Sequence, residues 1–400
     1  MKRRTVGFLF FAIVAGAAPP ADFAAALAEG RFLLNARLRF ESVEQTNLRD
    51  ADALTLRTRL GFTPAPFHGW TFLLEAENIT AAAGDRYSQS GLNPGGTGRA
   101  VVADPEITEL NQATVAYSLG KTKSTLGRQR LVLDNARFVG DVGWRQNMQT
   151  FDAFVVQDKT LNQTTLTYAY LDRINRVFGR QHPQGYWKSA SHLLNASYAG
   201  LPGCTLTGSA YLLDFRAPAY SANSCVTYGA SLVGDTAVAA GLKFAYRAEF
   251  ATQSDYGSSA LNYSAGYTAL EAGLIAKPGS LTLGHEVLGS GSNTGFKTPL
   301  ATLHAFNGWA DLFLATPAAG LRDSYLRGTA TLPGALALTL VQHWYEADRT
   351  GINLGTEFNA MVTRKFGSNF TGTVKYADFR RDSQTVPNVK KIWVQIELTY

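Results

Sequence analysis

Hydrophobic and polar residues alternate along much of this chain. In the run from Phe32 to Glu41 the even positions are apolar, and most odd positions are polar or charged. The same period returns at 54–62, 70–77, 242–251 and 392–400. Because successive side chains of a β-strand point to opposite faces, each run predicts a strand with one apolar and one polar face. The runs are about ten residues long, which is the length of a tilted transmembrane strand.

The connections between these runs support the same interpretation. All prolines beyond residue 20 fall in the predicted connections, as expected because proline lacks the N–H group that a central strand donates. Short turns alternate with loops of very unequal length, the longest of which lie at 81–107, 134–147, 173–189 and 289–321. Short periplasmic turns and long extracellular loops are typical of a barrel that crosses a membrane.

We therefore predict an all-β fold, a single transmembrane antiparallel β-barrel over residues 18–400 with about 18 strands. The predicted location is a Gram-negative outer membrane. A soluble β-sandwich would explain any one strand, but the strand length and the even strand number favour the barrel. A barrel of this size encloses an aqueous lumen rather than a core of side chains.

The first 17 residues have the three parts of a secretory signal peptide: basic residues, a short apolar segment, and small residues at the exit. A second small-residue site allows cleavage as late as residue 28. Removing residues 1–17 lowers the number of Lys and Arg residues from 37 to 34, against 31 Asp and Glu residues. A charge balance this close to neutral predicts no nucleic-acid partner.

The cysteines and histidines predict neither a metal site nor a cofactor. Cys204 and Cys225 are expected at opposite ends of one strand, too far apart for a disulfide bond. The six histidines are scattered along the chain, and His304 is expected to pack within a loop. No catalytic residue is predicted, although an acyl hydrolase with a Ser–His pair in the barrel wall remains an alternative.

The densest polar cluster of the sequence lies between residues 127 and 152. The alternation predicts that Arg128 and Arg130 face the lumen from one strand and Asp152 faces it from the next. Arg137 and Arg145 lie in the loop between them. Guanidinium groups bind carboxylates through two parallel hydrogen bonds, so this pattern predicts a lumen that attracts anionic sugars or organic acids.

Further charged residues complete the predicted solute-contacting set. Arg37, Arg39, Arg57 and Arg59 extend the basic wall of the lumen, because they share the polar faces of the first two strands. Asp134 and Asp152 are expected to position the arginines and to weaken anion binding enough for release. The alternative is that these ion pairs only join the barrel wall to a loop folded into the lumen.

The same cluster resembles the most recognisable segment of the alginate-export family of outer-membrane β-barrels. The matching segments are 127–152, 286–321 and, more weakly, 104–113, and the similarity extends from about residue 30 to Tyr400. The resemblance implies a barrel that passes an anionic polysaccharide such as alginate through an Arg-lined constriction. Two features depart from the family: the chain is shorter than the polymer exporters, and it ends in Tyr400 rather than phenylalanine.

Together these observations predict an outer-membrane channel for anionic solutes, not an enzyme. Its predicted partners are an anionic saccharide or organic anion, outer-membrane lipid and, if the solute is a polymer, a periplasmic export machinery. A general uptake porin for small solutes is the leading alternative. An adhesin, with recognition confined to the long loops, is another.

Overall fold

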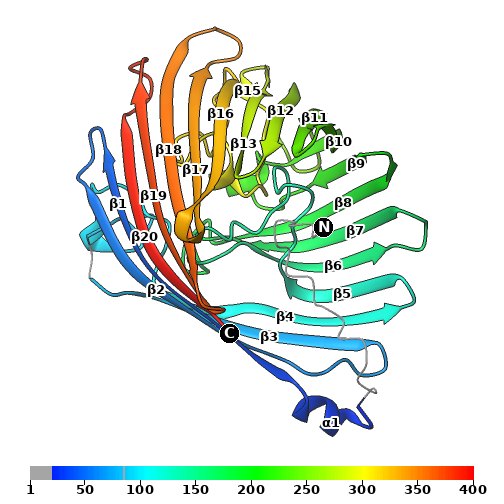
Figure 1. The fold of residues 1–400 in the computed structure, drawn as a ribbon. Helices are drawn as coiled ribbons and strands as arrows, with labels where there is room; N and C mark the ends of the chain where they lie inside the picture. Colours follow the sequence, from blue (N-terminus) through cyan, green and yellow to red (C-terminus); the bar gives the residue numbers. More distant parts are fainter. Residues whose placement is uncertain (1–19, 84–85) are drawn as a thin grey trace.

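The chain forms one antiparallel β-sheet of 18 strands that closes on itself (Figure 1). This computed structural model describes residues 20–83 and 86–400, so the predicted signal peptide at 1–17 lies outside the described residues. Each barrel strand pairs with its neighbour in the chain, and pairing of the first strand with the last closes the barrel. The predicted antiparallel barrel of about 18 strands is therefore confirmed.

The strands differ in length, and all of them run antiparallel to their neighbours. They are β1 (Arg31–Gln45), β2 (Ala51–Thr63), β3 (Trp70–Ala81), β4 (Ile107–Leu119), β5 (Thr122–Gln129), β6 (Thr150–Asp158), β7 (Thr164–Asn175), β8 (Tyr186–Leu201), β9 (Cys204–Leu213), β10 (Cys225–Ala239), β11 (Leu242–Asp255), β12 (Ser264–Ala276), β13 (Gly279–Leu288), β16 (Leu321–Leu332), β17 (Leu336–Glu346), β18 (Asn353–Phe366), β19 (Phe370–Arg381) and β20 (Val389–Thr399).

A few short elements lie outside the barrel wall. They are the helices α1 (Phe23–Ala28) and α2 (Pro218–Ser221), the hairpin of β14 (Ser290–Gly291) and β15 (Thr294–Gly295), and three turns of 3-10 helix, η1 (Pro94–Gly96), η2 (Leu303–Ala305) and η3 (Pro333–Ala335). Neither α1 nor α2 is long and apolar enough to cross a membrane, and they are the α-helices of the described part of the chain.

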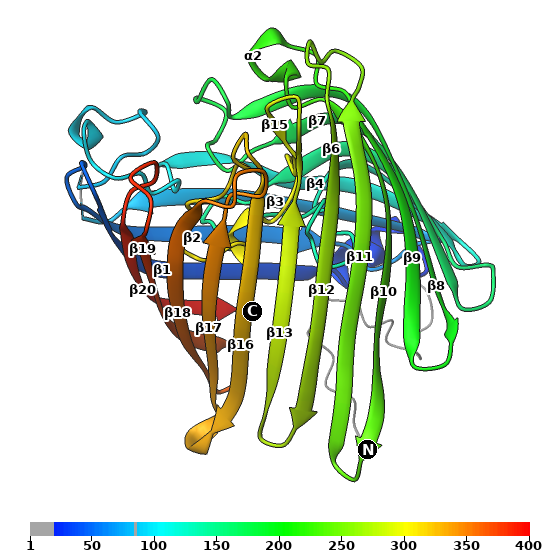
Figure 2. The ribbon, with the colours of Figure 1, turned by 90° about the horizontal axis from the view of Figure 1, so that it is seen from above.

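The two ends of the barrel differ, as the loop pattern predicts. Short turns join the strands at one end, whereas α2 and the β14–β15 hairpin belong to long loops at the other end (Figure 2). The prolines of the described loops and turns all lie outside the barrel strands. Cys204 and Cys225 are both free, in agreement with the predicted lack of a disulfide bond.

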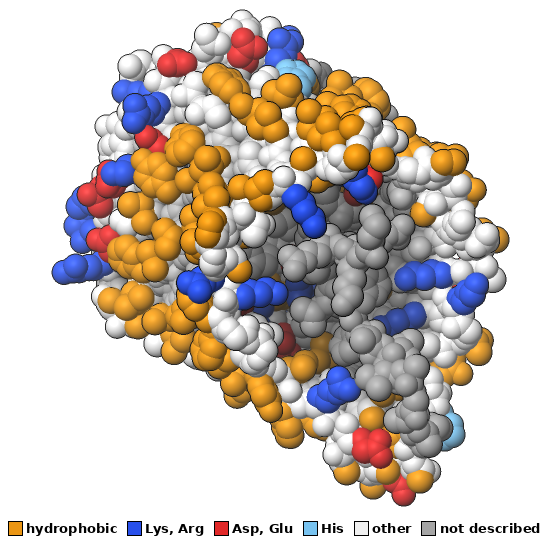
Figure 3. Space-filling model, in the orientation of Figure 1, with side chains coloured by type: hydrophobic (Ala, Val, Ile, Leu, Met, Phe, Trp, Pro, Cys, Tyr) orange, Lys and Arg blue, Asp and Glu red, His pale blue; other side chains and the backbone are white. Residues whose placement is uncertain are grey.

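The barrel wall has an apolar outer face and a polar inner face. On β1, Leu38 and Phe40 are exposed on the outside, whereas Arg37 and Arg39 point into the barrel and are buried. Hydrophobic side chains gather over the outer faces of the strands (Figure 3). A continuous apolar exterior is the surface that a lipid bilayer requires of a barrel.

Two long loops fold into the barrel and pack against the inward side chains of its wall. We call them the first inner loop (130–149, between β5 and β6) and the second inner loop (289–320, between β13 and β16). Val139 of the first and Leu300 of the second form an isolated parallel β-bridge, and both side chains are buried. The hydrophobic core therefore lies inside the barrel, between these loops and the wall.

Barrel closure predicts a disulfide bond across the β1–β20 seam. Asn35 faces Thr399 directly in the register, and directly paired residues have Cα atoms about 4.5–5.5 Å apart, within disulfide range. We expect the double variant Asn35→Cys, Thr399→Cys to form this bond on mild oxidation, detected as a linked peptide pair by mass spectrometry. The control Asn35→Cys, Gln395→Cys should not link, because Gln395 is about 13 Å further along the strand. Linkage of the control alone would show a different register.

Candidate functional site

The first inner loop docks against the arginine-rich wall formed by β1 and β2. Arg37 donates from Nε to Oε1 of Gln146 at 2.8 Å, and Arg39 donates from Nη2 to the carbonyl of Trp144. Arg59 donates from Nη2 to the carbonyl of Gln146 at 3.1 Å. These arginines point into the barrel as predicted, but their donors are directed to the loop backbone and side chains.

The remaining donors of this wall are directed to carboxylates. Arg57 pairs with Glu397 of β20 at 2.9 Å, and Arg59 pairs with Glu77 of β3. Because Arg57 and Arg59 are almost fully buried, a free solute would have to displace these partners to reach the guanidinium groups. The geometry therefore favours the structural alternative for these wall arginines.

Arg145 is the central cation of the first inner loop. Its Nη1 lies 3.0 Å from Glu41 of β1, and its Nη2 lies 2.9 Å from Asp311 of the second inner loop. Asp104 lies slightly further away, at 3.8 Å. Burial opposes the charge of Arg145, but these three carboxylates outweigh it and raise the pKa of the guanidinium above its ordinary value. Arg145 is thus held as a permanent cation between a loop and the wall.

Asp311 connects the second inner loop to the same network. It accepts from Nζ of Lys391 at 2.8 Å, and its Oδ1 lies 2.6 Å from Nδ1 of His304. Burial lowers the pKa of His304 well below its usual range. Burial alone would raise the pKa of Asp311, but His304, Lys391 and Arg145 lower it well below its usual range. His304 therefore packs within the loop, as expected from the sequence.

Aromatic side chains of both inner loops, Trp144 and Trp309, lie beside His304 and Lys375. The ring of His304 stacks on Trp144, with centroids 4.8 Å apart, and its Nε2 lies 2.7 Å from Nζ of Lys375 on β19. That Nζ also lies 3.8 Å from the ring centroid of Trp309 and 4.1 Å from that of Trp144. Cation–π contacts of this kind stabilise a desolvated ammonium group, so Lys375 anchors both inner loops to the wall.

Arg137 and Asp134 attach the first inner loop to the opposite wall. Arg137 donates from Nε to Glu286 of β13 at 2.6 Å and from Nη2 to Asn307 at 3.1 Å. Burial opposes its charge, but Glu286 raises the pKa of Arg137 above its ordinary value. Asp134 accepts hydrogen bonds from Arg247 of β11. Arg247 was not predicted as a site residue, although its place on the polar face of the run at 242–251 is a usable signal.

The predicted lumen positions of Arg128 and Asp152 are wrong. Arg128 is paired directly with Asp152 in the register, and their neighbours two positions away, Leu126 and Phe154, are 56% and 39% exposed on the outer face. Side chains two residues apart in a strand share a face, so the Arg128–Asp152 ion pair lies outside the barrel. Arg130 lies just beyond the end of β5 and pairs with Asp141 of the first inner loop.

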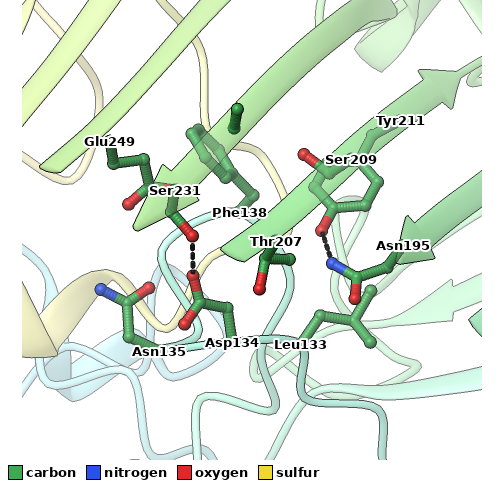
Figure 4. Close-up of a pocket in the computed structure, with 11 residues that line it drawn as sticks. Leu133, Asp134, Asn135, Phe138, Asn195, Thr207, Ser209, Tyr211, Ser231 and Glu249 are labelled. Atoms are coloured by element: carbon green, nitrogen blue, oxygen red, sulfur yellow. Dashed lines mark hydrogen bonds between the residues drawn. The ribbon is translucent and has the colours of Figure 1, made fainter. Parts of the chain in front are cut away.

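A small polar pocket lies where the first inner loop approaches β8–β11. Asp134 of the loop faces Ser231 of β10 across it, and Asn195 of β8 donates to the hydroxyl of Tyr211 on β9 at 3.1 Å (Figure 4). Thr207, Ser209 and Glu249 complete this side. Hydroxyl and amide groups line this wall, in contrast to the arginines of β1 and β2. No group of three or more His, Cys, Asp or Glu side chains in the described ranges could hold a metal ion.

The charges of the inner wall are unevenly distributed. Carboxylates outnumber cations among the inward side chains of β11 to β18, where Arg247 and Arg327 also point inward, whereas cations outnumber carboxylates from β19 through β20 and β1 to β2, where Glu41 and Glu397 also point inward. The carboxylates are Glu249, Glu271, Glu286, Asp323 and Glu357, and the cations are Lys375, Lys391, Arg37, Arg39, Arg57 and Arg59. Most of these side chains are buried, and the inner loops contact both groups, so the interior of the barrel is of mixed charge.

Comparison with solved structures identifies barrels of the same architecture. Acinetobacter baumannii OccAB4 has a TM-score of 0.72 at 12% sequence identity, over 93% of this chain and 98% of that one. Pseudomonas aeruginosa OccK9 (OpdG) has a TM-score of 0.71 at 14% identity, over 94% and 100%. A BenF-like porin from Pseudomonas fluorescens Pf-5 has a TM-score of 0.69 at 13% identity, over 92% and 99%. No family model and no curated protein matches the sequence.

These neighbours correct the family expected from the sequence. The similar barrels are Occ proteins and a BenF-like porin, so the assignment to the alginate-export family is wrong. The residues that carried that resemblance, in 127–152 and 286–321, fold and anchor the two inner loops. The closed 18-stranded barrel with an apolar exterior is an outer-membrane protein, as predicted.

Loss of Arg145 should loosen both inner loops. The variant Arg145→Ala leaves Glu41, Asp104 and Asp311 close together without their shared cation, which costs about 3–5 kcal/mol for a buried pair. We expect a lower melting temperature and a larger, noisier single-channel conductance in planar bilayers. The control Arg380→Ala removes an exposed ion pair with Asp378 and should change neither. Parent-like conductance and stability of Arg145→Ala would show that the loops are held by other contacts.

Proposed function

We propose that this protein is a passive uptake porin for small water-soluble molecules. The observation that carries the proposal is the position of the two inner loops, which lie inside the barrel and are fixed there by Arg145, Asp311 and Arg137. A thick polymer requires a wide continuous passage, whereas a narrowed lumen admits small solutes and excludes large ones. The similarity in fold to a BenF-like porin supports the same function.

The polar side chains that line the inner wall at β8–β11 support a solute class of small polar molecules. Asn195, Thr207 and Ser209 offer neutral hydrogen-bonding groups, and Arg247 and Asp134 add one charge of each sign. Such a surface replaces part of the hydration of a hydroxyl- or carboxyl-bearing solute without holding it tightly. The anion preference expected from the sequence stays a prediction, with Arg247 as its proposed carrier in place of Arg128.

Passive diffusion determines which partners this function requires. A porin of this kind passes solute down its concentration gradient, so it needs no periplasmic export machinery. The same proposal makes the protein a channel rather than an enzyme, and it assigns the buried histidines a role in packing. In particular, Nδ1 of His343 faces the carboxylate of Asp323 at 2.9 Å within the wall.

The size limit of the channel tests the proposal directly. We expect proteoliposomes containing the protein to swell in isotonic monosaccharide, more slowly in disaccharide, and not measurably in tetrasaccharide, because the inner loops narrow the lumen. The same series should be run with uronates of equal chain length. Arg145→Ala, in which the loops are loosened, serves as the matched variant and should admit the larger sugars. Equal rates for a tetrameric uronate and its monomer would overturn the uptake proposal.

Measurements of ion selectivity can distinguish the effect of Arg247, which faces the lumen, from that of Arg128, which lies on the outer face. Arg247→Gln leaves the carboxylates of Asp134 and Glu249 without their cation, so we expect the reversal potential in a salt gradient to shift towards cation preference. Arg128→Ala removes a charge from the outer face and is the matched control, with no expected shift. A larger shift for Arg128→Ala than for Arg247→Gln would contradict the positions assigned to these side chains.

A further inference from the structure

A row of cations crosses the outer face of four neighbouring strands at the long-loop end of the barrel. Arg128 of β5 is paired in register with Asp152 of β6, Asp152 with Arg173 of β7, and Arg173 with Lys188 of β8. Directly paired side chains lie on the same face of a sheet, so the row lies on the outside with Arg128. We call Arg128, Arg173 and Lys188 the outer cationic patch.

The height of the patch places it at the level of lipid headgroups. Each of its members lies within three residues of the strand end that leads into a long loop. Directly below it on the outer face are Leu126 and Phe154, and Leu194 lies further along β8 on the same face. A charged row just above an apolar band lies at the membrane interface, on the side of the outer leaflet.

The charges of the patch are incompletely balanced. Arg128 forms two hydrogen bonds with Asp152, at 2.7 and 3.1 Å, and Arg173 lies 3.9 Å from the same carboxylate. Lys188 is exposed and makes no ion pair with any described residue. Asp172, in the bulge beside Arg173, is also exposed without an ion pair in the described chain. Two of the three cations thus share the carboxylate of Asp152, and the third contacts no carboxylate of the described chain.

Three cations on the outer faces of other strands at this end differ from this pattern. Each of the three has an acidic partner: Lys390 pairs with Glu44 at 3.2 Å, Arg380 with Asp378 at 2.9 Å, and Arg322 with Asp348 at 2.8 Å. Such one-to-one pairs leave little net charge at the membrane surface. The outer cationic patch therefore carries an excess of positive charge that these three strand positions do not.

We propose that the outer cationic patch binds the phosphate groups of a phosphorylated glycolipid in the outer leaflet. The forked donors of Arg173 and the ammonium group of Lys188 suit phosphate oxygens. The ring of Tyr186 lies under the guanidinium of Arg173, 4.7 Å from its centroid, and holds it at the surface. The acyl chains of the same lipid lie along the apolar band below. This binding site is independent of the solute that the lumen passes.

The test compares lipid binding to the purified parent barrel and to paired variants. Binding of bisphosphorylated lipid A and of its dephosphorylated form is measured in detergent by native mass spectrometry. We expect the parent to prefer the phosphorylated lipid, and Arg173→Ala, Lys188→Ala to weaken its binding about tenfold or more. The control Arg380→Ala, Lys390→Ala removes two cations from elsewhere on the rim and should bind like the parent.

Three outcomes would overturn the proposal. The first is equal binding of both lipids by the parent, and the second is parent-like binding by the patch variant. The third is equal competition by inorganic phosphate at the same concentration, which would mean a site for free phosphate instead of a lipid site. Both variants carry exposed substitutions, and retention of the folded barrel is checked by heat-dependent migration in gel electrophoresis.

Discussion

The desolvated ion network around Arg145 and Asp311 is the interaction on which the interior of this protein depends. It joins the first inner loop to β1, the second inner loop to β20, and the two loops to each other. A buried charge without partners is very costly, so each member of the network requires the others. The loops are therefore held in the lumen by the condition that every buried charge of this network keeps an oppositely charged partner. Hydrophobic contacts such as Val139 with Leu300 complete the packing.

This condition explains why the arginines of the wall are poor candidates for solute contact. Arg37, Arg39 and Arg59 direct their donors to the first inner loop, and the loop in turn covers them. The side chains that line the inner wall at β8–β11 are mostly neutral hydrogen-bonding groups. Arg247 and Asp134 form one ion pair between wall and loop there. In the proposed porin, the space that the inner loops leave open, more than the number of arginines, determines which solutes pass.

The outer surface follows a different rule from the lumen. Inside the barrel, charges must be paired because loops exclude water from them. At the rim above the apolar band, side chains face lipid headgroups and water, and unpaired cations such as Lys188 are tolerated there. The same residue type therefore has two functions in this protein, in loop anchoring inside and in contact with the membrane surface outside.

The sequence alone determined the barrel fold, because the features that indicate it can be read from short stretches of the chain. A period of two along each strand, prolines confined to connections, and loops of unequal length follow directly from backbone geometry and from the solvent on each face. The separation of Cys204 and Cys225 follows from the same strand rhythm. The inward positions of Arg37, Arg39, Arg57 and Arg59 were likewise predictable, because their neighbours along the strand are apolar.

Only the tertiary structure decided what the charged residues contact. A charged strand residue is expected to face the lumen where the outer face of the strand contacts lipid tails. Arg128 lies near the end of β5, where the outer face is at the level of the headgroups, so its charge does not predict which face it occupies. Glu41 and Asp311, which bind Arg145, and Glu286, which binds Arg137, are each more than 100 residues away from their arginine in the chain. No local pattern encodes such distant pairs, because they form only when the closed barrel brings loop and wall together.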